Sequence, residues 1–445
     1  MYKPFFTYLL ILFLSNSIVV TAQEVLTLNE ALQFAIESNV DIAKDKNNEA
    51  STKYNKKRAY LSLLPSVNAS ANLFESTGTN FDQLTGVLRT ETGQYVNASI
   101  TASWDILNVL NKLSDLKLSK YNHESQKAQL EYTKDFVVLN VVGRYLETLQ
   151  AIKQDKILNK FCDVQEAQLK RTQELIKVGA LPGQDYYTQN AEWSRLKSSR
   201  EDNLNILNTK KNELMLLLRM DPSKEIELEK NLKVVLFDRN VSIDSLYEKA
   251  LEKRKDYKQL EAQSIANKHQ VNLQRAAYIP SFSVYYNYGS RYSSFQTRTF
   301  KDQFLKDNIT NTIGVSINIP VFNGIRVRNE VYKAKQNFEN SELDVVQIKN
   351  DIYVELKNLM NTISANKKKA AYRKDQTESA KRAYELEQER YYLGQGNPLD
   401  LGVAQRNYIE ASLLLNQIKY QLMYNRYELL FLTGNIDSLL LNKRS

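Results

Sequence analysis

The chain has 445 residues but only one cysteine and two histidines. With a single cysteine, Cys162, it forms no intramolecular disulfide. His123 and His269 fall inside segments of helical periodicity, without cysteines, further histidines or paired carboxylates at the spacing of metal ligands. Neither a nucleophile elbow nor a metal-binding motif occurs in the sequence. The sequence therefore predicts a protein that is not an enzyme and that carries no metal or cofactor.

Glycine and proline are also scarce, with 13 and seven residues, while 42% of the chain is apolar. This composition indicates a helix-rich chain with few irregular regions. After residue 22, no segment approaches eighteen uninterrupted apolar residues, so no transmembrane helix is expected there. The net charge of +9 comes from Lys and Arg that are spread among Asp and Glu along whole helices. No basic stripe interleaved with aromatics appears, so nucleic acid is not an expected partner.

The N-terminus has the features of a targeting segment. A lysine at position 3 precedes an apolar run at residues 5–14, and Val-Thr-Ala at residues 20–22 is a small-residue cleavage site. Residues 1–22 are therefore predicted to be a signal peptide, and the mature chain to be exported. An uncleaved membrane anchor is the alternative, which is less favoured because Ser-Asn-Ser at residues 15–17 breaks the run.

The remainder of the chain repeats itself at a distance of 215 residues, without net insertion or deletion. Leu-Pro-Ser at residues 64–66 returns as Ile-Pro-Ser at 279–281, and Val178-Gly179 returns as Leu393-Gly394. We therefore expect internal pseudo-twofold organisation rather than two unrelated domains. The predicted divisions are a first repeat at 23–219, a linker at 220–242, a second repeat at 243–434 and a C-terminal tail at 435–445.

Long helices dominate both repeats. Residues 325–392 contain neither proline nor glycine, and apolar residues recur there at spacings of three and four. Such a helix would be on the order of 100 Å long, so it must pack lengthwise on other helices. The apolar positions are Val345, Ile348, Ile352, Leu356, Leu359 and Ile363. The returning helix keeps a heptad pattern typical of coiled coils, and a similar helix is expected at about 113–178 in the first repeat.

Each long helix is predicted to end in a tight turn, at about residues 179–184 and 394–399. Gly179 and Gly394 supply the left-handed residue that closes one helix, and proline followed by aspartate opens the next. The result is two antiparallel helical hairpins. The aspartates, Asp185 and Asp400, are explained either by helix capping and dipole compensation or by a role in a pore.

Between the helices, each repeat changes its period from about 3.6 residues to two. Residues 95–106 alternate polar and apolar without error, which indicates a half-buried strand. Four strands are predicted, at about 66–76, 95–107, 281–292 and 310–322. The strands of each pair are joined by polar segments. Trp104 and several tyrosines between residues 285 and 292 are the aromatic types found at membrane interfaces.

Four strands of this length in an exported protein leave two open edges. About twelve extended residues, tilted by about 45°, cross a ~30 Å hydrocarbon layer, but lipid cannot satisfy the backbone groups of an open edge. Closure would need other copies: about eight strands from a dimer or about twelve from a trimer, and only the larger barrel leaves an aqueous lumen. A soluble sheet packed on a helix is the alternative.

The order of these features resembles that of the TolC-like outer-membrane efflux channels. The matching elements are the signal peptide, Leu28-x-Glu30-Ala31-Leu32 at the start of a helix, Leu-Pro-Ser before a strand pair, and Val-Gly-x5-Asp at a hairpin turn. The resemblance covers the mature chain to about Asn435. It implies a mainly α fold with a membrane β-barrel contribution, in which four strands per chain close a 12-stranded barrel in a homotrimer. Coiled-coil helical hairpins would extend into the periplasm of a Gram-negative bacterium.

The same resemblance implies a function and partners. The chain would be the exit duct of a tripartite efflux pump for drugs, metals or other small molecules. Its partners would be outer-membrane lipid, a periplasmic adaptor and an inner-membrane pump. The exit duct of type I protein secretion is an alternative. A structural envelope coiled coil and an adhesin are less favoured, because a rod has no reason to break its coiled coil twice with membrane-length strands.

The resemblance assigns residue roles only at the hairpin tips. Asp400 aligns with an acidic ring that narrows the tunnel entrance, with Asp185 as its first-repeat counterpart, and Tyr391 aligns with a tyrosine of the network that holds this entrance shut. The chain departs from the family pattern at Gly396, where that network has an arginine, and at Val403, where a second aspartate is found. The residues expected to contact the adaptor are Gly179, Ala180, Leu181, Gly394, Gln395 and Gly396.

Overall fold

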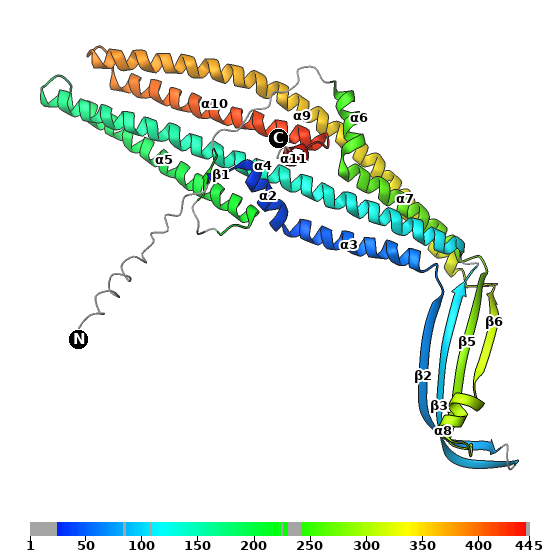
Figure 1. Ribbon diagram of the computed structural model, residues 1–445. Coiled ribbons are helices and arrows are strands. Elements are labelled where there is room, and N and C mark those ends of the chain that lie inside the picture. Colours follow the sequence, from blue (N-terminus) through cyan, green and yellow to red (C-terminus); the bar gives the residue numbers. More distant parts are fainter. Residues whose placement is uncertain are drawn as a thin grey trace, which may run out of the picture. The chain divides into compact units, whose positions relative to one another are not determined.

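A computed structural model describes residues 25–82, 86–106, 109–221, 223, 226–229 and 242–441 (Figure 1). The predicted signal peptide at residues 1–22 lies outside the described residues, as does most of the predicted linker at 220–242. The elements in chain order are β1 (Val25–Leu26), α2 (Leu28–Ser38), α3 (Val40–Leu61), β2 (Ser66–Asp82), β3 (Val87–Asp105), α4 (Val109–Lys177), α5 (Gly183–Leu218), β4 (Glu227–Leu228), α6 (Ile243–Lys253), α7 (Lys255–Ala276), β5 (Ser281–Ser293), α8 (Phe300–Asp302), the π-helix η1 (Gln303–Asp307), β6 (Thr310–Asn318), α9 (Arg326–Tyr392), α10 (Pro398–Leu432) and α11 (Ser438–Leu441).

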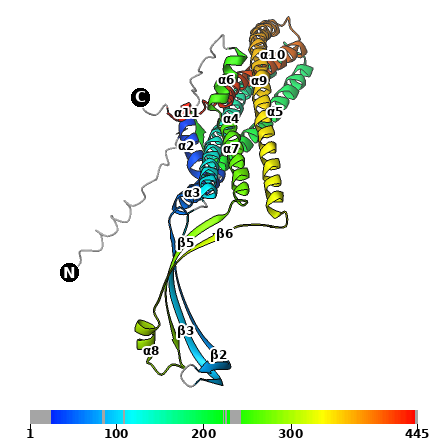
Figure 2. The same ribbon diagram turned by 90° about the vertical axis from the view of Figure 1, so that its right-hand side faces the viewer.

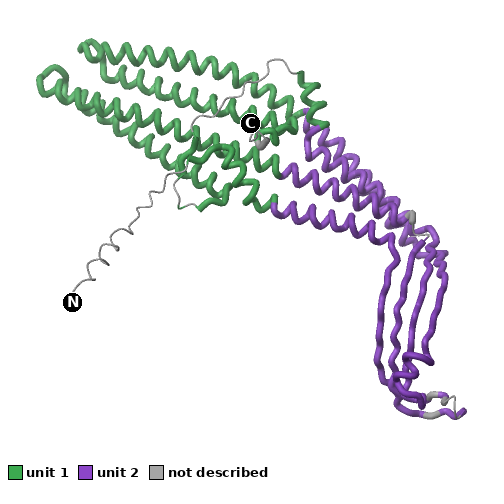
Figure 3. The backbone as a smooth tube through the Cα atoms, viewed as in Figure 1, with its two compact units in different colours: residues 1–42, 134–252, 354–445 green, residues 43–133, 253–353 purple. Residues whose placement is uncertain are grey.

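The chain forms two compact units (Figure 3). The first unit comprises residues 1–42, 134–252 and 354–445, and the second comprises residues 43–133 and 253–353. Because each unit takes segments from both repeats, neither unit corresponds to one copy of the duplicated sequence. Each unit is therefore built from segments of both repeats.

The second unit contains an antiparallel four-stranded sheet in the order β2-β3-β5-β6. The strands lie side by side in two perpendicular views (Figures 1 and 2). Ser66 pairs with Ser103 across β2 and β3, and Tyr95 pairs with Ser293 across β3 and β5. The central pair, β3 and β5, joins the strand hairpin of one repeat to that of the other. Within the described chain, β2 and β6 each pair on one side only.

The sheet has two faces of opposite character, because successive side chains of a strand point to opposite sides. The polar face carries Ser66, Asn68, Ser70, Asn72, Asn97, Ser99, Thr101, Ser103, Asn287, Thr312 and Ser316. The apolar face carries Val67, Leu73, Val96, Ile100, Trp104, Val284, Tyr286, Tyr288, Ile313, Val315 and Ile317. Many of the apolar side chains are open to the surroundings; Leu73, for example, is 76% exposed and Ile313 79%.

The strand ends differ from the prediction in both hairpins. β2 and β3 continue well beyond the expected bounds, because threonines within the expected polar loop pair across the two strands. Thr77 and Thr92 share a hydroxyl hydrogen bond of 2.8 Å, as do Thr79 and Thr90. β6 is shorter than expected and ends at Asn318. Proline at position 320 has no N–H to donate to a ladder, which accounts for this end.

The connection between β5 and β6 is also more ordered than a polar loop. It forms α8 and η1, held by the fully buried side chain of Gln303. The Nε2 of Gln303 donates to the carbonyl oxygens of Ser293 (3.1 Å) and Arg298 (2.8 Å), and its Oε1 accepts from the backbone N–H of Ser293 (3.0 Å). A buried, fully used amide of this kind fixes the path of the segment between residues 293 and 303.

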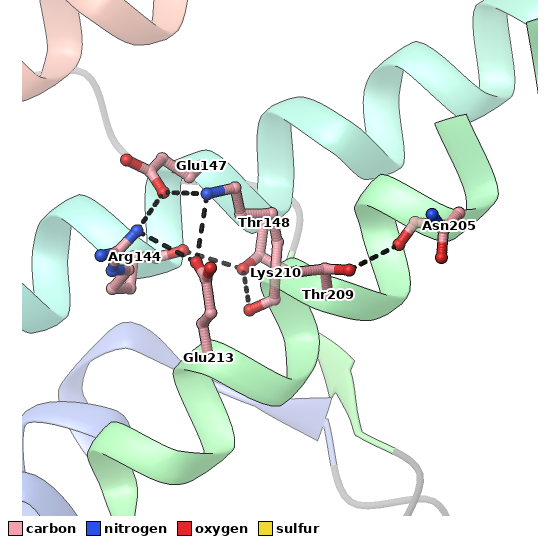
Figure 4. Close-up of polar contacts among 7 residues, drawn as sticks. All are labelled: Arg144, Glu147, Thr148, Asn205, Thr209, Lys210 and Glu213. Atoms are coloured by element: carbon pink, nitrogen blue, oxygen red, sulfur yellow. Dashed lines mark hydrogen bonds and ion pairs between the residues drawn. The ribbon is translucent and has the colours of Figure 1, made fainter. Parts of the chain in front are cut away.

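In the first unit, α4 and α5 form one antiparallel hairpin and α9 and α10 form the other (Figure 1). Arg144 and Lys210 alternate with Glu147 and Glu213 in a ring of four ion pairs, of 2.9 to 3.1 Å, that links α4 to α5 (Figure 4). These side chains are partly exposed, so each pair contributes at most about 1 kcal/mol. The buried Thr148 hydroxyl adds hydrogen bonds to the carbonyls of Arg144 and Lys210 at the same level.

The first unit also contains a small sheet, in which β1 pairs with β4 in parallel. The fully buried Tyr145 of α4 donates its hydroxyl hydrogen to the carbonyl oxygen of Leu26 at 2.9 Å. Burial raises the pKa of Tyr145. A capping box between Thr27 and Glu30 begins α2 immediately after β1. The predicted helical stripe of α9 is confirmed at four of its six positions, because Ile352, Leu356, Leu359 and Ile363 are at most 5% exposed; Val345 and Ile348 are half-buried.

None of the helices in the described part of the chain is both long and apolar enough to cross a membrane.

Candidate functional site at the hairpin tips

The two hairpin turns have the same backbone geometry. Gly179 and Gly394 adopt left-handed conformations, with φ of 76° and 73°. After each glycine, the next backbone N–H bonds a carbonyl five residues earlier: Ala180 to Leu175 and Gln395 to Arg390, both at 2.9 Å. This is the Schellman arrangement, which satisfies carbonyl groups at a helix end. The predicted role of the two glycines as helix terminators is confirmed.

The caps of the returning helices correct the explanation of the aspartates. The N-cap of α5 is Pro182, which makes no side-chain cap hydrogen bond, and the N-cap of α10 is Asn397, whose side chain accepts from the N–H of Leu399 at 2.9 Å. Asp185 and Asp400 therefore do not cap their helices. They lie in the first helical turn, where a carboxylate still interacts favourably with the helix dipole.

A buried aromatic cluster lies just behind the second tip. Tyr384, Tyr391, Leu401 and Ala404 form its centre, and Leu181 from the first tip packs against it. Leu181 thereby brings the turn of one hairpin into contact with the helices of the other. Burial raises the pKa of Tyr384 to about 12, so this phenol is neutral at physiological pH.

Tyr391 forms a polar contact between the hairpins inside this cluster. Its hydroxyl lies 3.1 Å from the Thr172 hydroxyl of α4, and the two side chains are 2% and 1% exposed. Burial raises the pKa of Tyr391, and the negative charge of Asp185 raises it further. Asp185 is itself 8% exposed, and burial raises its pKa. The structure thus brings together two of the three residues predicted at the entrance.

Two further contacts connect the hairpins. The guanidinium of Arg171 lies 4.0 Å from the centroid of the Tyr392 ring, in a cation–π contact. The Glu192 carboxylate, 10% exposed, accepts hydrogen bonds from Arg195 on its own helix and from Arg406 of α10 at 2.9 Å. We refer to Glu192, Arg195 and Arg406 as the Glu192 clamp, because a single acid of the first repeat holds an arginine of the second.

The geometry of the second tip explains why this chain has Gly396 where the family pattern has an arginine. A Cβ at this position would lie 2.7 Å from the backbone nitrogen of Tyr391 and 2.9 Å from its Cα. Real Cβ atoms do not approach backbone this closely. The turn as folded therefore has no room for arginine, or for any side chain, at residue 396.

Asp400 has different surroundings from Asp185. It is exposed and lines a groove of about 760 Å³ along α9 and α10, together with Val403, Glu387 and Glu410. The structure therefore separates the two aspartates by environment: one is buried against the inter-hairpin tyrosine, and the other is open on a helical groove.

The remaining predicted tip residues are exposed or only partly covered. Gly179, Ala180, Gly394 and Gln395 are exposed, while Leu181 and Gly396 are half-buried. Sequence reasoning missed Thr172, Arg171, Glu192 and Arg406, because helical periodicity identifies the buried side of a helix but not the helix that faces it. The spacing of Glu192 and Arg195 by three residues was the available signal.

Within the described residues, no three His, Cys, Asp or Glu side chains are grouped so as to hold a metal ion. The tips instead combine hydrogen bonds, a cation–π contact, ion pairs and apolar packing. Such a set of contacts serves to hold the two hairpins together.

Comparison with known proteins agrees with this architecture. Residues 246–435 match the outer membrane efflux protein family. A segment of 146 residues is 23% identical to the outer membrane efflux protein BepC of Brucella suis, covering 33% of this chain and about a third (32%) of that relative. The fold matches the CmeC outer membrane channel of Campylobacter jejuni, with a TM-score of 0.78 and 18% identity over 92% of this chain and 86% of that one. It also matches VceC of Vibrio cholerae, with a TM-score of 0.79 and 14% identity over 92% and 96% of the two chains.

The fold is that of the TolC-like outer-membrane channels, a class of channel proteins rather than enzymes. The chain carries an outer membrane efflux protein domain in its second repeat. The resemblance drawn from the sequence and the outer-membrane location that it implied are confirmed.

Proposed function

We propose that this protein is the outer-membrane exit duct of a tripartite efflux pump. Three copies of the four-stranded sheet would close a barrel of about twelve strands around an aqueous lumen. The helical hairpins would continue the duct through the periplasm. A periplasmic adaptor and an inner-membrane pump would complete the path, and the cargo would be small molecules.

The two-faced sheet with two open edges is the observation that carries this proposal. Its apolar face is largely exposed, which suits a hydrocarbon environment. Its polar face carries mostly small uncharged side chains, with Arg291 and Asp105 among the charged positions, and this suits a wet lumen. The unpaired edges of β2 and β6 would leave backbone groups without partners in lipid. Pairing β2 of one copy with β6 of the next satisfies both edges at once.

The tips suit a docking surface for the adaptor. Val178 and Leu393, which immediately precede the two turn glycines, are 77% and 67% exposed, and Leu399 is 56% exposed. Apolar side chains that project at the ends of long hairpins lose contact with water when a partner covers them. The six predicted contact residues of the two turns belong to this proposed surface.

The contacts between the hairpins would hold the entrance in one state. The Tyr391–Thr172 hydrogen bond and the Glu192 clamp connect helices that must slide if the tips separate. Since Gly396 leaves no place for the family's arginine, these contacts are the ones available to this chain. Breaking them should raise the fraction of time that the pore is open.

Assembly is tested by cross-linking and light scattering of the detergent-purified protein. A trimer that dissociates only on heating, with a heat-modifiable gel mobility, is expected. A stable folded monomer or dimer after correction for detergent would contradict the proposal.

Topology is tested by labelling single cysteines with an impermeant reagent in intact cells, after replacement of Cys162. Cysteines placed within 76–94 or 293–308 should react, whereas those within the two turns should be protected. The reverse pattern would overturn the proposed orientation.

The pore role of Asp400 is tested in planar bilayers. Three carboxylates converging at an entrance would favour cations and bind polyvalent ones. We expect a cation-selective pore blocked by multivalent cations, and both properties should weaken in Asp400→Asn. Unchanged selectivity and block in that variant would remove Asp400 from the pore.

A further inference from the structure

Three aromatic side chains form a cluster on the polar face of the sheet, which carries Tyr285 at a separate position. Phe74 and Tyr95 pair across β2 and β3, and their rings are stacked with centroids 5.1 Å apart and planes at 15°. Phe295, from the segment that follows β5, meets Tyr95 edge-on at 6.2 Å. We call Phe74, Tyr95 and Phe295 the polar-face aromatic cluster. The strand positions around it on the same face carry mostly serine, threonine and asparagine.

A glycine sets the position of the third ring. Gly93 lies on the same face as Tyr95, and a Cβ there would come within 2.2 Å of the Phe295 ring. The ring thus lies directly over the backbone of β3. The buried amide of Gln303 fixes the segment on which Phe295 sits, so the ring is held on both sides.

The cluster is only partly covered by the chain itself. Phe74 remains 44% exposed and Phe295 37% exposed. Packing within the chain explains the edge-on contact between Phe295 and Tyr95. It does not cover the outer faces of the Phe74 and Phe295 rings. An aromatic face in water binds another flat π-system by stacking, and it attracts cations as well.

We propose that the polar-face aromatic cluster is a binding site for planar aromatic molecules on their way out of the duct. This inference rests on the proposed function, because the polar face then lines the lumen and three clusters, one per copy, line a single passage. Every transported molecule would pass over them. The site adds a preference for aromatic cargo at the exit barrel, far along the chain from the hairpin tips.

The test measures single-channel current of the trimer in planar bilayers with ethidium as the planar aromatic probe. Tetrabutylammonium, a cation without a π-system, is the comparison probe. The double variant Phe74→Leu/Phe295→Leu keeps apolar side chains but removes two π-faces. It should shorten the ethidium block by about tenfold, because each aromatic contact that is lost contributes a several-fold factor. The tetrabutylammonium block should not change.

Two further variants separate binding from structure. Gly93→Ala keeps all three aromatic residues but displaces Phe295, so it should shorten the ethidium block by a smaller factor. Tyr288→Leu removes a tyrosine of similar exposure (43%) on the apolar face and should leave the block unchanged.

Unchanged ethidium block in the double variant and in Gly93→Ala would overturn the inference while leaving the duct intact. A larger conductance with an unchanged ethidium block would also overturn it, since the rings would then only narrow the lumen. If the wild-type trimer forms no pore, the proposed function itself is wrong and the cargo site falls with it.

Discussion

The two hairpin tips have nearly the same turn and very different surroundings. Both end a long helix at a left-handed glycine and begin the next helix within a few residues. The first tip inserts Leu181 into the aromatic cluster, and the corresponding position of the second tip is Gly396, which lies against backbone. Asp185 is buried, whereas its counterpart Asp400 is exposed.

The same asymmetry holds for the other contacts between the hairpins. Thr172 and Arg171 of the first repeat meet Tyr391 and Tyr392 of the second, and none of the four has the same residue type at its counterpart position. Duplication therefore kept the residues that make a hairpin and changed those that join one hairpin to the other. The two repeats can form these contacts, hydroxyl to hydroxyl and guanidinium to ring, because they have diverged at the contact positions.

The largest effect is expected from adding a methyl group at the crowded tip. Gly396→Ala places a Cβ against the Tyr391 backbone and should cost about 2–3 kcal/mol, because the turn must move. At the first tip, a Cβ at Gly183 meets nothing within 4 Å, so Gly183→Ala should be neutral or stabilising by up to about 1 kcal/mol. Thermal unfolding followed by circular dichroism at equal protein concentration compares the two. Equal effects would show that the tips do not differ in packing.

Removing the charge of the Glu192 clamp should have the next largest effect. Glu192→Gln leaves Arg195 and Arg406 close together without an anion, and we expect a loss of about 1–2 kcal/mol, moderated by the partial exposure of both arginines. The matched control is Glu174→Gln, whose ion pair with Lys177 is 70% exposed on both sides and should be silent. The melting midpoint serves as the measurement, and a clamp variant as stable as the control would contradict the assignment.

Loss of the buried hydroxyl contact should be smaller. Tyr391→Phe removes the hydrogen bond to Thr172 and should cost about 0.5–1.5 kcal/mol, together with an increased open fraction in bilayer recordings. Tyr392→Phe keeps the ring that stacks with Arg171 and is the control. If both variants behave like the wild type in melting and conductance, the hydroxyl contact does not hold the tips.

The smallest effect is a pH dependence expected from Asp185. Because burial raises the pKa of Asp185, the folded state binds its proton more readily than the unfolded state, so this group favours folding at low pH and disfavours it at neutral pH. Asp185→Asn should therefore raise the melting midpoint slightly at pH 7, and the gain should shrink as the pH falls toward 4. Asp400→Asn, at an exposed position, should change stability by less than about 0.5 kcal/mol. A pH-independent gain from Asp185→Asn would exclude the carboxyl as its cause.

Sequence patterns predicted the elements whose cause is local. The alternation of residues 95–106 places them on a strand, and the apolar spacing around Ile352 and Leu356 places them on a buried helical stripe. Three strand predictions were wrong at their ends. Paired threonines extended β2 and β3, and proline at position 320 stopped β6 short. Cross-strand pairing decides such ends, and a single strand read alone does not reveal its partner.

The sequence by itself determined the hairpin turns, the two-faced strands and the internal duplication, because glycine conformation and side-chain periodicity act over a few residues. Only the tertiary structure decided that Asp185 is buried and Asp400 open, that Leu181 and Gly396 have unlike roles, and that Glu192 holds Arg406 across the hairpins. These properties depend on which helix faces which across more than 200 residues of chain. Helical periodicity does not specify which helices face each other. The packing of one diverged repeat against the other decides this.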